Sequence, residues 1–177
     1  MTEVRTPRLI LRRRHDDDLA PMADITADPQ VTRWVADGSV QDLDQTAEAM
    51  QRWEEEWDEG GFGLFAAELP ASGEAAGFVG LSVPEFLPEV LPAVGISCRL
   101  GPQFWGQGDA SEGAHATSEF ALQDRGLDRV ISISAVDDDA PENVMRKLGM
   151  VLARETTHPV YGIPLNVHAI DLTEFHA

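Results

Sequence analysis

The segment from Ala93 to Val136 places the strongest constraint on the fold. It begins with a strand-like run that ends at Leu100, passes through a turn with the motif Gly106-Gln107-Gly108, and then becomes a helix that ends near Gly126. Strand composition returns at 129–136. A strand, a helix and a second strand in this order are typical of α/β domains, so the sequence predicts a mixed α/β fold.

The rest of the chain supplies further strands and helices around this unit. One helix is well marked by apolar residues that recur at spacings of three and four and form one face: Leu43, Ala47, Met50, Trp53 and Trp57. We expect strands at 8–14, 62–69, 76–83, 151–157 and 167–175, and helices at 19–28, 42–59 and 140–150. A short helix or turn at 28–35 and a proline-rich loop at 84–92 complete the order. Hairpin-like turns join several of these strands, which predicts antiparallel pairing.

Length and composition predict one domain that spans residues 1–177. The chain is 43% hydrophobic and has no linker or repeat, which suits a single core. The N-terminal residues contain no long apolar run, so we expect neither a signal peptide nor a membrane span. Cys98 is the only cysteine, and the histidines lack the spacing of metal ligands, so we expect no disulfide, no metal site and a cytoplasmic protein.

The net charge of −18 repels nucleic acid, because a phosphate backbone needs Lys and Arg contacts. Acidic residues are concentrated from Asp37 to Glu59, where nine acids accompany one base. This charge has two explanations. It keeps the protein soluble, or it attracts a cationic substrate or a basic protein surface.

The glycine turn also has two explanations. Gly106 and Gly108 remove side chains just before a helix, whose free N–H groups then admit a phosphate. Alternatively, they only supply the positive φ angles of a tight turn. The motif is neither a P-loop nor a dinucleotide fingerprint, since Ser111 stands where a third glycine or alanine is expected. Asp109 is an unfavourable neighbour for a phosphate.

Four segments resemble one family. "RLGPQFWGQGDASEGAHA" (Arg99–Ala116) is similar to the coenzyme A pyrophosphate loop of the GNAT acetyltransferases, with its pattern Gln/Arg-x-x-Gly-x-Gly/Ala. "TPRLILRR", "FVGL" and "VMRKLGM" resemble segments of the ribosomal-protein-alanine N-acetyltransferase branch of that family, in the same order. The resemblance extends from about Pro7 to Phe175.

The resemblance implies a mostly antiparallel sheet whose fourth and fifth predicted strands splay apart in a V and hold acetyl-CoA as cosubstrate. On this basis the cofactor-binding residues are Cys98, Arg99, Leu100, Gln103, Trp105, Gly106, Gln107, Gly108, Asp109, Ala110 and Ser111. The acceptor amine would enter from the side of the early helices, with Trp34, Trp57 and Phe62 as pocket walls.

The usual acid and base groups of the family are missing. Gly95 stands at the position of a glutamate that the branch often carries, Asp138 and Pro141 replace an Asn-x-x-Ser pattern, and Met145 replaces a tyrosine. Asp138 and Tyr161 are therefore the catalytic candidates, although Asp138 also suits a helix cap and Tyr161 suits plain packing. A third explanation is catalysis by proximity and water alone.

The resemblance thus predicts an acetyl-CoA-dependent N-acetyltransferase that acts directly on a primary amine, either a protein N-terminus or a small cationic amine. The alternative is a catalytically weak or inactive acyl-CoA-binding module on the same fold. Neither nucleic acid nor a membrane is expected as a partner. A homodimer formed through the loop at 84–92 and the last strands is one arrangement that the sequence allows.

Overall fold

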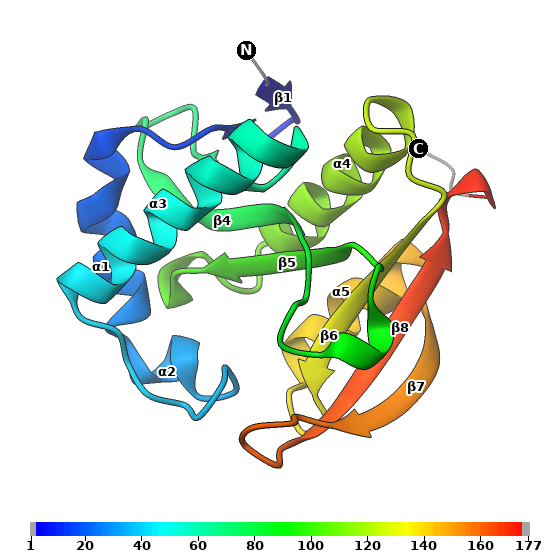
Figure 1. The fold of residues 1–177 in the computed structure, drawn as a ribbon. Coiled ribbons are helices and arrows are strands. Elements are labelled where there is room, and N and C mark those ends of the chain that lie inside the picture. The colour runs from blue at the N-terminus through cyan, green and yellow to red at the C-terminus, as the bar shows by residue number, and fades with distance from the viewer. Residues whose placement is uncertain (1–2, 175–177) are drawn as a thin grey trace.

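The computed structural model describes residues 3–174, which form an α/β domain around one sheet of eight strands (Figure 1). The strands are β1 Glu3–Arg5, β2 Ile10–Arg12, β3 Leu64–Glu68, β4 Ala75–Ser82, β5 Gly95–Leu100, β6 Arg129–Ala135, β7 Val151–Thr157 and β8 Pro164–Asp171. The helices are α1 Leu19–Thr26, α2 Pro29–Thr32, α3 Leu43–Gly60, α4 Asp109–Gln123 and α5 Asp139–Leu148. No helix within 3–174 is both long and apolar enough to cross a membrane.

The sheet has the strand order β1-β2-β3-β4-β5-β6-β8-β7 and is antiparallel except at one place. Strands β5 and β6 are parallel and pair only at Gly95 and Ile131, after which they diverge (Figure 1). The sheet therefore consists of two halves joined at the start of β5. The predicted mixed, mostly antiparallel fold with a V-shaped splay is confirmed. Because β1 is an additional strand, the splay lies between β5 and β6.

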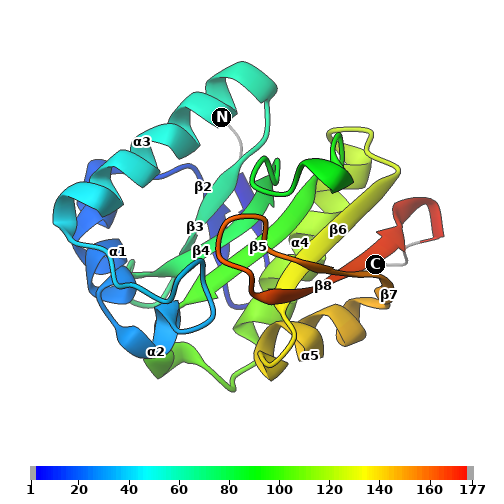
Figure 2. The ribbon, with the colours of Figure 1, turned by 60° about the horizontal axis from the view of Figure 1, so that its bottom comes forward.

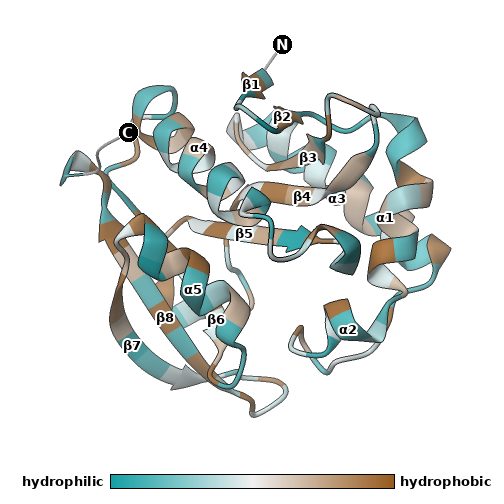
Figure 3. Ribbon diagram, turned by 180° about the vertical axis from the view of Figure 1, so that it is seen from behind, coloured by the Kyte–Doolittle hydropathy of each residue, from teal (hydrophilic) through white to brown (hydrophobic). Residues whose placement is uncertain are grey.

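Helices cover both faces of the sheet (Figure 2). Helices α1 and α3 lie on one face, where Met22, Ile25 and Met50 pack against Phe78 in one apolar cluster. Helix α4 covers the other face and packs against β4 and β5 (Figure 3). The largest core cluster lies on this second side and contains Phe65, Val79 and residues of α4 and α5.

Local sequence signals explain the best-defined helix. Asp42 caps α3 by accepting from the N–H of Gln45 at 2.8 Å, while the Gln45 side chain accepts from the N–H of Asp42 at 2.9 Å. Gly61 ends the helix in the left-handed conformation, with φ at +74°. The helix thus occupies 43–60, close to the predicted 42–59.

The structure corrects the predicted elements at several ends. Strand β1 was not predicted, because three mostly exposed residues carry no detectable alternation. Strand β8 occupies 164–171 instead of 167–175, because its hairpin partner β7 extends the pairing to Thr157 and Pro164. Phe175, the end of the predicted strand, lies outside the described residues. The loop at 84–92 contains a 3₁₀ turn, Pro88–Val90.

Candidate active site

The backbone of Cys98 faces the gap that opens between β5 and β6. The N–H of Gly101 donates to the carbonyl of Ala76 at 2.9 Å, and this bond fixes the hydrogen-bond alternation along β5. Arg99, opposite Phe78, therefore bonds to β4, whereas the N–H and C=O of Cys98 point toward β6. Since β6 has diverged there, the Cys98 amide has no partner strand. An extended ligand could add to β5 at this edge.

The turn after β5 leads into a helix whose N-terminus is open. Gly108 is the N-cap of α4, with φ at +84°, and no side chain caps the helix. Gly106 has φ at +76°, and a Cβ built there would meet no heavy atom within 4 Å. The space beside Gly106 is therefore open, whereas the guanidinium of Arg8 lies beside Gly108. The uncapped N–H groups at the start of α4 are the kind of donors that bind an anion.

Arg8, a residue that the sequence did not single out, holds this turn in place. Its Nε lies 3.1 Å from Oε1 of Glu112, and its Nη1 donates to the carbonyl of Gln107. The same Nη1 lies 3.6 Å from the carboxylate of Asp109, which is only 4% exposed. Arg8 thus offsets one of the two carboxylate charges, those of Asp109 and Glu112, that lie beside the turn.

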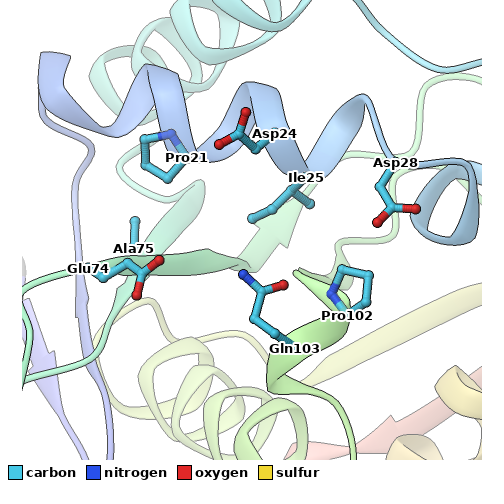
Figure 4. Close-up of a pocket in the computed structure, with 8 residues that line it drawn as sticks. All are labelled: Pro21, Asp24, Ile25, Asp28, Glu74, Ala75, Pro102 and Gln103. Atoms are coloured by element: carbon cyan, nitrogen blue, oxygen red, sulfur yellow. The ribbon is translucent and has the colours of Figure 1, made fainter.

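The predicted cofactor residues from Gln103 to Ser111 lie together in this turn and the first turn of α4. The indole Nε1 of Trp105 donates to the carbonyl of Leu100 at 2.9 Å and ties the turn to the end of β5. The side chain of Gln103 points toward α1, where it lines a pocket of about 260 Å³ (Figure 4). Three carboxylates also line that pocket: Asp24, Asp28 and Glu74.

Cys98 is accessible but poorly reactive. Its side chain is exposed on the α4 side of β5, opposite Val79. Desolvation by the surrounding protein nevertheless raises the pKa of the thiol to about 11, and the opposing charge of Arg99 does not compensate. Little thiolate exists at neutral pH, so the thiol is a weak nucleophile.

The three residues predicted to line the acceptor pocket lie in different environments. Phe62 lines a pocket of about 230 Å³ together with Ser82 of β4 and three glutamates: Glu56, Glu59 and Glu85. Burial, together with the negative charge of Glu85, raises the pKa of Glu56. Trp34 is half-buried in the turn after α2, with the guanidinium of Arg33 4.7 Å from its ring centroid.

Trp57 does not line an open pocket, so its predicted role as a pocket wall is not supported by its position. The side chain is 4% exposed, and its Nε1 donates to the carbonyl of Leu64 at 2.9 Å. The centroid of its ring lies 4.9 Å from the ring centroid of Phe65 and 6.0 Å from that of Phe120, in the cluster on the α4 side. The helical spacing groups Trp57 with Met50 and Trp53, but in the structure those two residues pack in the cluster on the α1 and α3 side, whereas Trp57 does not.

The two catalytic candidates lie on separate elements. Asp138 follows β6 and is the N-cap residue of α5. Burial raises the pKa of Asp138, the nearby backbone N–H of Ala140 partly opposes this effect, and the charge of Asp139 adds to it. Tyr161 is 47% exposed in the β7–β8 turn, 4.7 Å from the ring of His158. The structure gives no hydrogen bond between Asp138 and Tyr161 within residues 3–174.

Sequence reasoning also missed a hydroxyl pair beside Gly95. The Oγ atoms of Ser82 and Ser97 lie 3.3 Å apart across β4 and β5, on the face covered by α1 and α3. Two serines on different strands give no sequence signal, since only the register of the sheet brings them together.

Comparison with known proteins identifies the family. Residues 8–151 match the model of the GNAT acetyltransferase domain. The chain belongs to the GNAT acetyltransferase family. The matched residues include the splay, the glycine turn and Asp138, whereas Tyr161 lies beyond them.

Solved structures share this fold at low sequence identity. A GNAT-family acetyltransferase from Bacillus anthracis is 20% identical, with a TM-score of 0.80 over 98% of this chain and 100% of that one. RimL, a ribosomal L7/L12 α-N-protein acetyltransferase in complex with coenzyme A, is 17% identical, with a TM-score of 0.81 over 96% and 98%. Ribosomal-protein-S5-alanine acetyltransferase from Vibrio fischeri is 12% identical, with a TM-score of 0.77 over the full length of both chains.

Proposed function

We propose that this chain transfers an acetyl group from acetyl-CoA directly to a primary amine. The observation that carries the proposal is the juxtaposition at the end of β5. The unpaired amide of Cys98 lies one short turn before the uncapped N-terminus of α4. The first feature suits the amides of a pantetheine arm, and the second suits a pyrophosphate. Family membership supports acetyl-CoA as the acyl donor.

In this proposal the backbone does most of the cofactor binding. The pantetheine arm adds to β5 along Cys98 and Leu100, and the N–H groups from Gly106 to Ser111 receive the pyrophosphate. A backbone N–H of β5 then polarises the thioester carbonyl, which needs no particular side chain. Because backbone groups make these contacts, the same mode of binding is compatible with the low sequence identity to the solved structures.

The proposed chemistry is direct attack by the amine on the thioester carbon. The amine loses a proton, the C–S bond breaks, and the thiolate of coenzyme A takes up a proton. Asp138 is the proposed proton acceptor, because it follows β6, one side of the splay, and burial raises its pKa. Holding both reactants together supplies a further large part of the rate.

The proposed acceptor is a protein N-terminus or a small amine. The acidic pocket beside Phe62 supports a group that carries positive charge, since Glu56, Glu59 and Glu85 line it. RimL and the Vibrio fischeri enzyme are described as acting on ribosomal proteins, which makes N-terminal peptides a natural first panel.

Steady-state release of coenzyme A thiol tests the proposal. Purified protein, acetyl-CoA and a panel of N-terminal peptides, polyamines and aminoglycosides should give amine-dependent thiol release that continues over many turnovers. Binding of acetyl-CoA without amine-dependent release by any member of a broad panel would instead favour the alternative, a non-catalytic acyl-CoA-binding module.

A further inference from the structure

Arg99 is a partly buried cation without a carboxylate partner. The contrast with Arg12 is clear. Arg12 is 7% exposed and contacts the carboxylates of both Asp18 and Glu68. Arg99 is half-buried, yet it forms neither an ion pair nor a side-chain hydrogen bond within residues 3–174. In a chain of net charge −18, an unpaired arginine at such a position requires an explanation.

The local protein does little to stabilise this charge. The guanidinium carbon lies 5.2 Å from the centroid of the Phe78 ring, a cation–π contact that satisfies none of its N–H groups. Burial lowers the pKa of Arg99, which shows that the surroundings disfavour the cation. An arginine nevertheless stays protonated, so its donors remain available to an anion from outside the chain.

The sheet register places Arg99 next to the proposed reaction centre. It directly follows Cys98, whose amide faces the splay, and its side chain lies on the opposite face of β5 from the Cys98 thiol. That face is covered by α1 and α3, because Phe78 and Ile25 belong to the apolar cluster on this side. This is the side from which the amine is proposed to enter.

We propose that Arg99 binds a carboxylate carried by the amine acceptor. This inference rests on the proposed function and names the substrate class of the same site. The planar guanidinium matches a carboxylate with two parallel hydrogen bonds. The phosphates of acetyl-CoA are assigned to the N-terminus of α4, on the other face, so they do not account for Arg99. The acceptor therefore bears an anionic group near its amine.

The carboxylate could be the α-carboxylate of a free amino acid or a glutamate side chain of a peptide, and matched pairs of acceptors distinguish these two sources. In the first arm, free amino acids are compared with their α-amides. In the second, N-terminal peptides with glutamate at the second position are compared with the same peptides carrying glutamine. We expect the carboxylate member of one arm to have a kcat/KM at least about tenfold higher, mainly through KM, as charge-assisted hydrogen bonds allow.

Three variants test the role of Arg99. Arg99→Met keeps the apolar contact with Phe78 and should lower kcat/KM mainly for the carboxylate acceptor, so that the preference falls to about twofold or less. Arg99→Lys should retain part of the preference, because it keeps the charge but not the paired donors. Arg33→Met is the matched control, since Arg33 also stacks on a ring and has no acidic partner among residues 3–174, but is exposed. It should leave the preference unchanged.

Binding measurements test whether Arg99 binds the acceptor carboxylate without requiring catalytic turnover. With coenzyme A present, the thermal shift given by the carboxylate member of that one arm should exceed the shift given by its neutral partner, and Arg99→Met should remove the difference. Equal shifts and equal rates for both members in both arms would overturn the inference while leaving the proposed function intact. A loss of acetyl-CoA binding in Arg99→Met would also overturn it, by assigning Arg99 to the cofactor. A wild-type protein that binds no acetyl-CoA would overturn the proposed function itself.

Discussion

Arg12 and Asp18 form a two-point ion pair in the protein interior, with Nη1 to Oδ2 at 2.8 Å and Nη2 to Oδ1 at 3.0 Å. The pair joins β2 to the 3₁₀ turn Asp16–Asp18, which leads into α1. Asp18 also accepts from the N–H of His15 at 2.7 Å. The pair thereby anchors the first helix to the sheet and sets the position of the face on which the acceptor is proposed to bind.

Breaking this pair should destabilise the fold. Asp18→Asn leaves the buried guanidinium without its main counter-charge, so we expect the free energy of unfolding to fall by about 3–5 kcal/mol. Urea denaturation measures the change. Glu89→Gln is the control, because Glu89 pairs with Arg154 at 2.7 Å on the surface and should cost much less. A similar loss in both variants would refute this account of the pair.

The same pair predicts how stability depends on pH. Desolvation acts to raise the pKa of Asp18, but hydrogen bonds from Arg12 and His15 and the charge of Arg12 together lower it. The folded state therefore binds fewer protons at this site than the unfolded state. Its contribution to stability is complete above the unfolded pKa of about 3.9 and is lost as pH falls through the lower folded value. Denaturation from pH 7 to pH 3 should show a shallower acid loss in Asp18→Asn than in the wild type.

Two glycines give a matched test of the proposed pyrophosphate turn. Gly106 and Gly126 have φ at +76° and +66°, and a Cβ at either would meet no heavy atom within 4 Å. Alanine at either position should cost about 1 kcal/mol of stability through backbone strain. Only Gly106→Ala should also weaken acetyl-CoA binding, since its methyl group enters the space assigned to phosphate. Equal affinity of the two variants, measured by calorimetry, would argue against this turn as the phosphate site.

The alkylation rate of the Cys98 thiol tests whether acetyl-CoA binds along β5 in the splay. With its pKa at about 11, it should react slowly with iodoacetamide at pH 7.5, at a rate that rises about tenfold per pH unit. Bound acetyl-CoA should slow the labelling further, because the pantetheine arm would cover this edge of β5. Mass spectrometry measures both effects. Cys98→Ser should keep most of the acetyltransferase activity, and its complete inactivation would point to a covalent role instead.

Variants of Asp138 and Asp139 distinguish a role of Asp138 in proton transfer from a structural role at the start of α5. If Asp138 accepts the proton of the amine, Asp138→Asn should lower kcat by about 100-fold or more. The pKa of Asp138 is raised, so wild-type activity should increase with pH through a value above the usual aspartate pKa, and this limb should vanish in Asp138→Asn. Asp139→Asn changes a neighbouring exposed carboxylate and should leave kcat nearly unchanged. Equal effects of both variants would indicate a structural role at the start of α5.

Much of the fold could be predicted from sequence patterns alone. The apolar spacing and capping residues of α3 predict its ends to within one residue, and the glycine turn correctly divides β5 from α4. The short exposed strand β1 escaped prediction, because its three residues depend on pairing with β2 and carry no pattern of their own. The prediction for Trp57 failed because the sequence places it on the same helical face as Trp53. In the folded protein Trp57 packs in the core cluster on the α4 side, whereas Trp53 packs in the cluster on the α1 and α3 side.

The site could be predicted only where it consists of backbone. Glycines at a strand–helix junction indicate an open helix N-terminus, and the structure has one at Gly108. The support from Arg8 and the contact between Ser82 and Ser97 depend on segments far apart in the chain. The isolation of Arg99 could not be seen either, because the absence of a partner is a property of the packed structure.

The central claim is that the splay and the glycine turn bind acetyl-CoA, and thermal unfolding tests it most directly. Acetyl-CoA at about 100 times its Kd should stabilise the protein by about 2.7 kcal/mol, which raises Tm by about 5–10 °C for a chain of this length. ATP at the same concentration should give a far smaller shift, because it lacks the pantetheine arm that pairs with β5. A clear shift with acetyl-CoA alone is the result that we predict. No shift with acetyl-CoA, or an equal shift with ATP, would contradict the account.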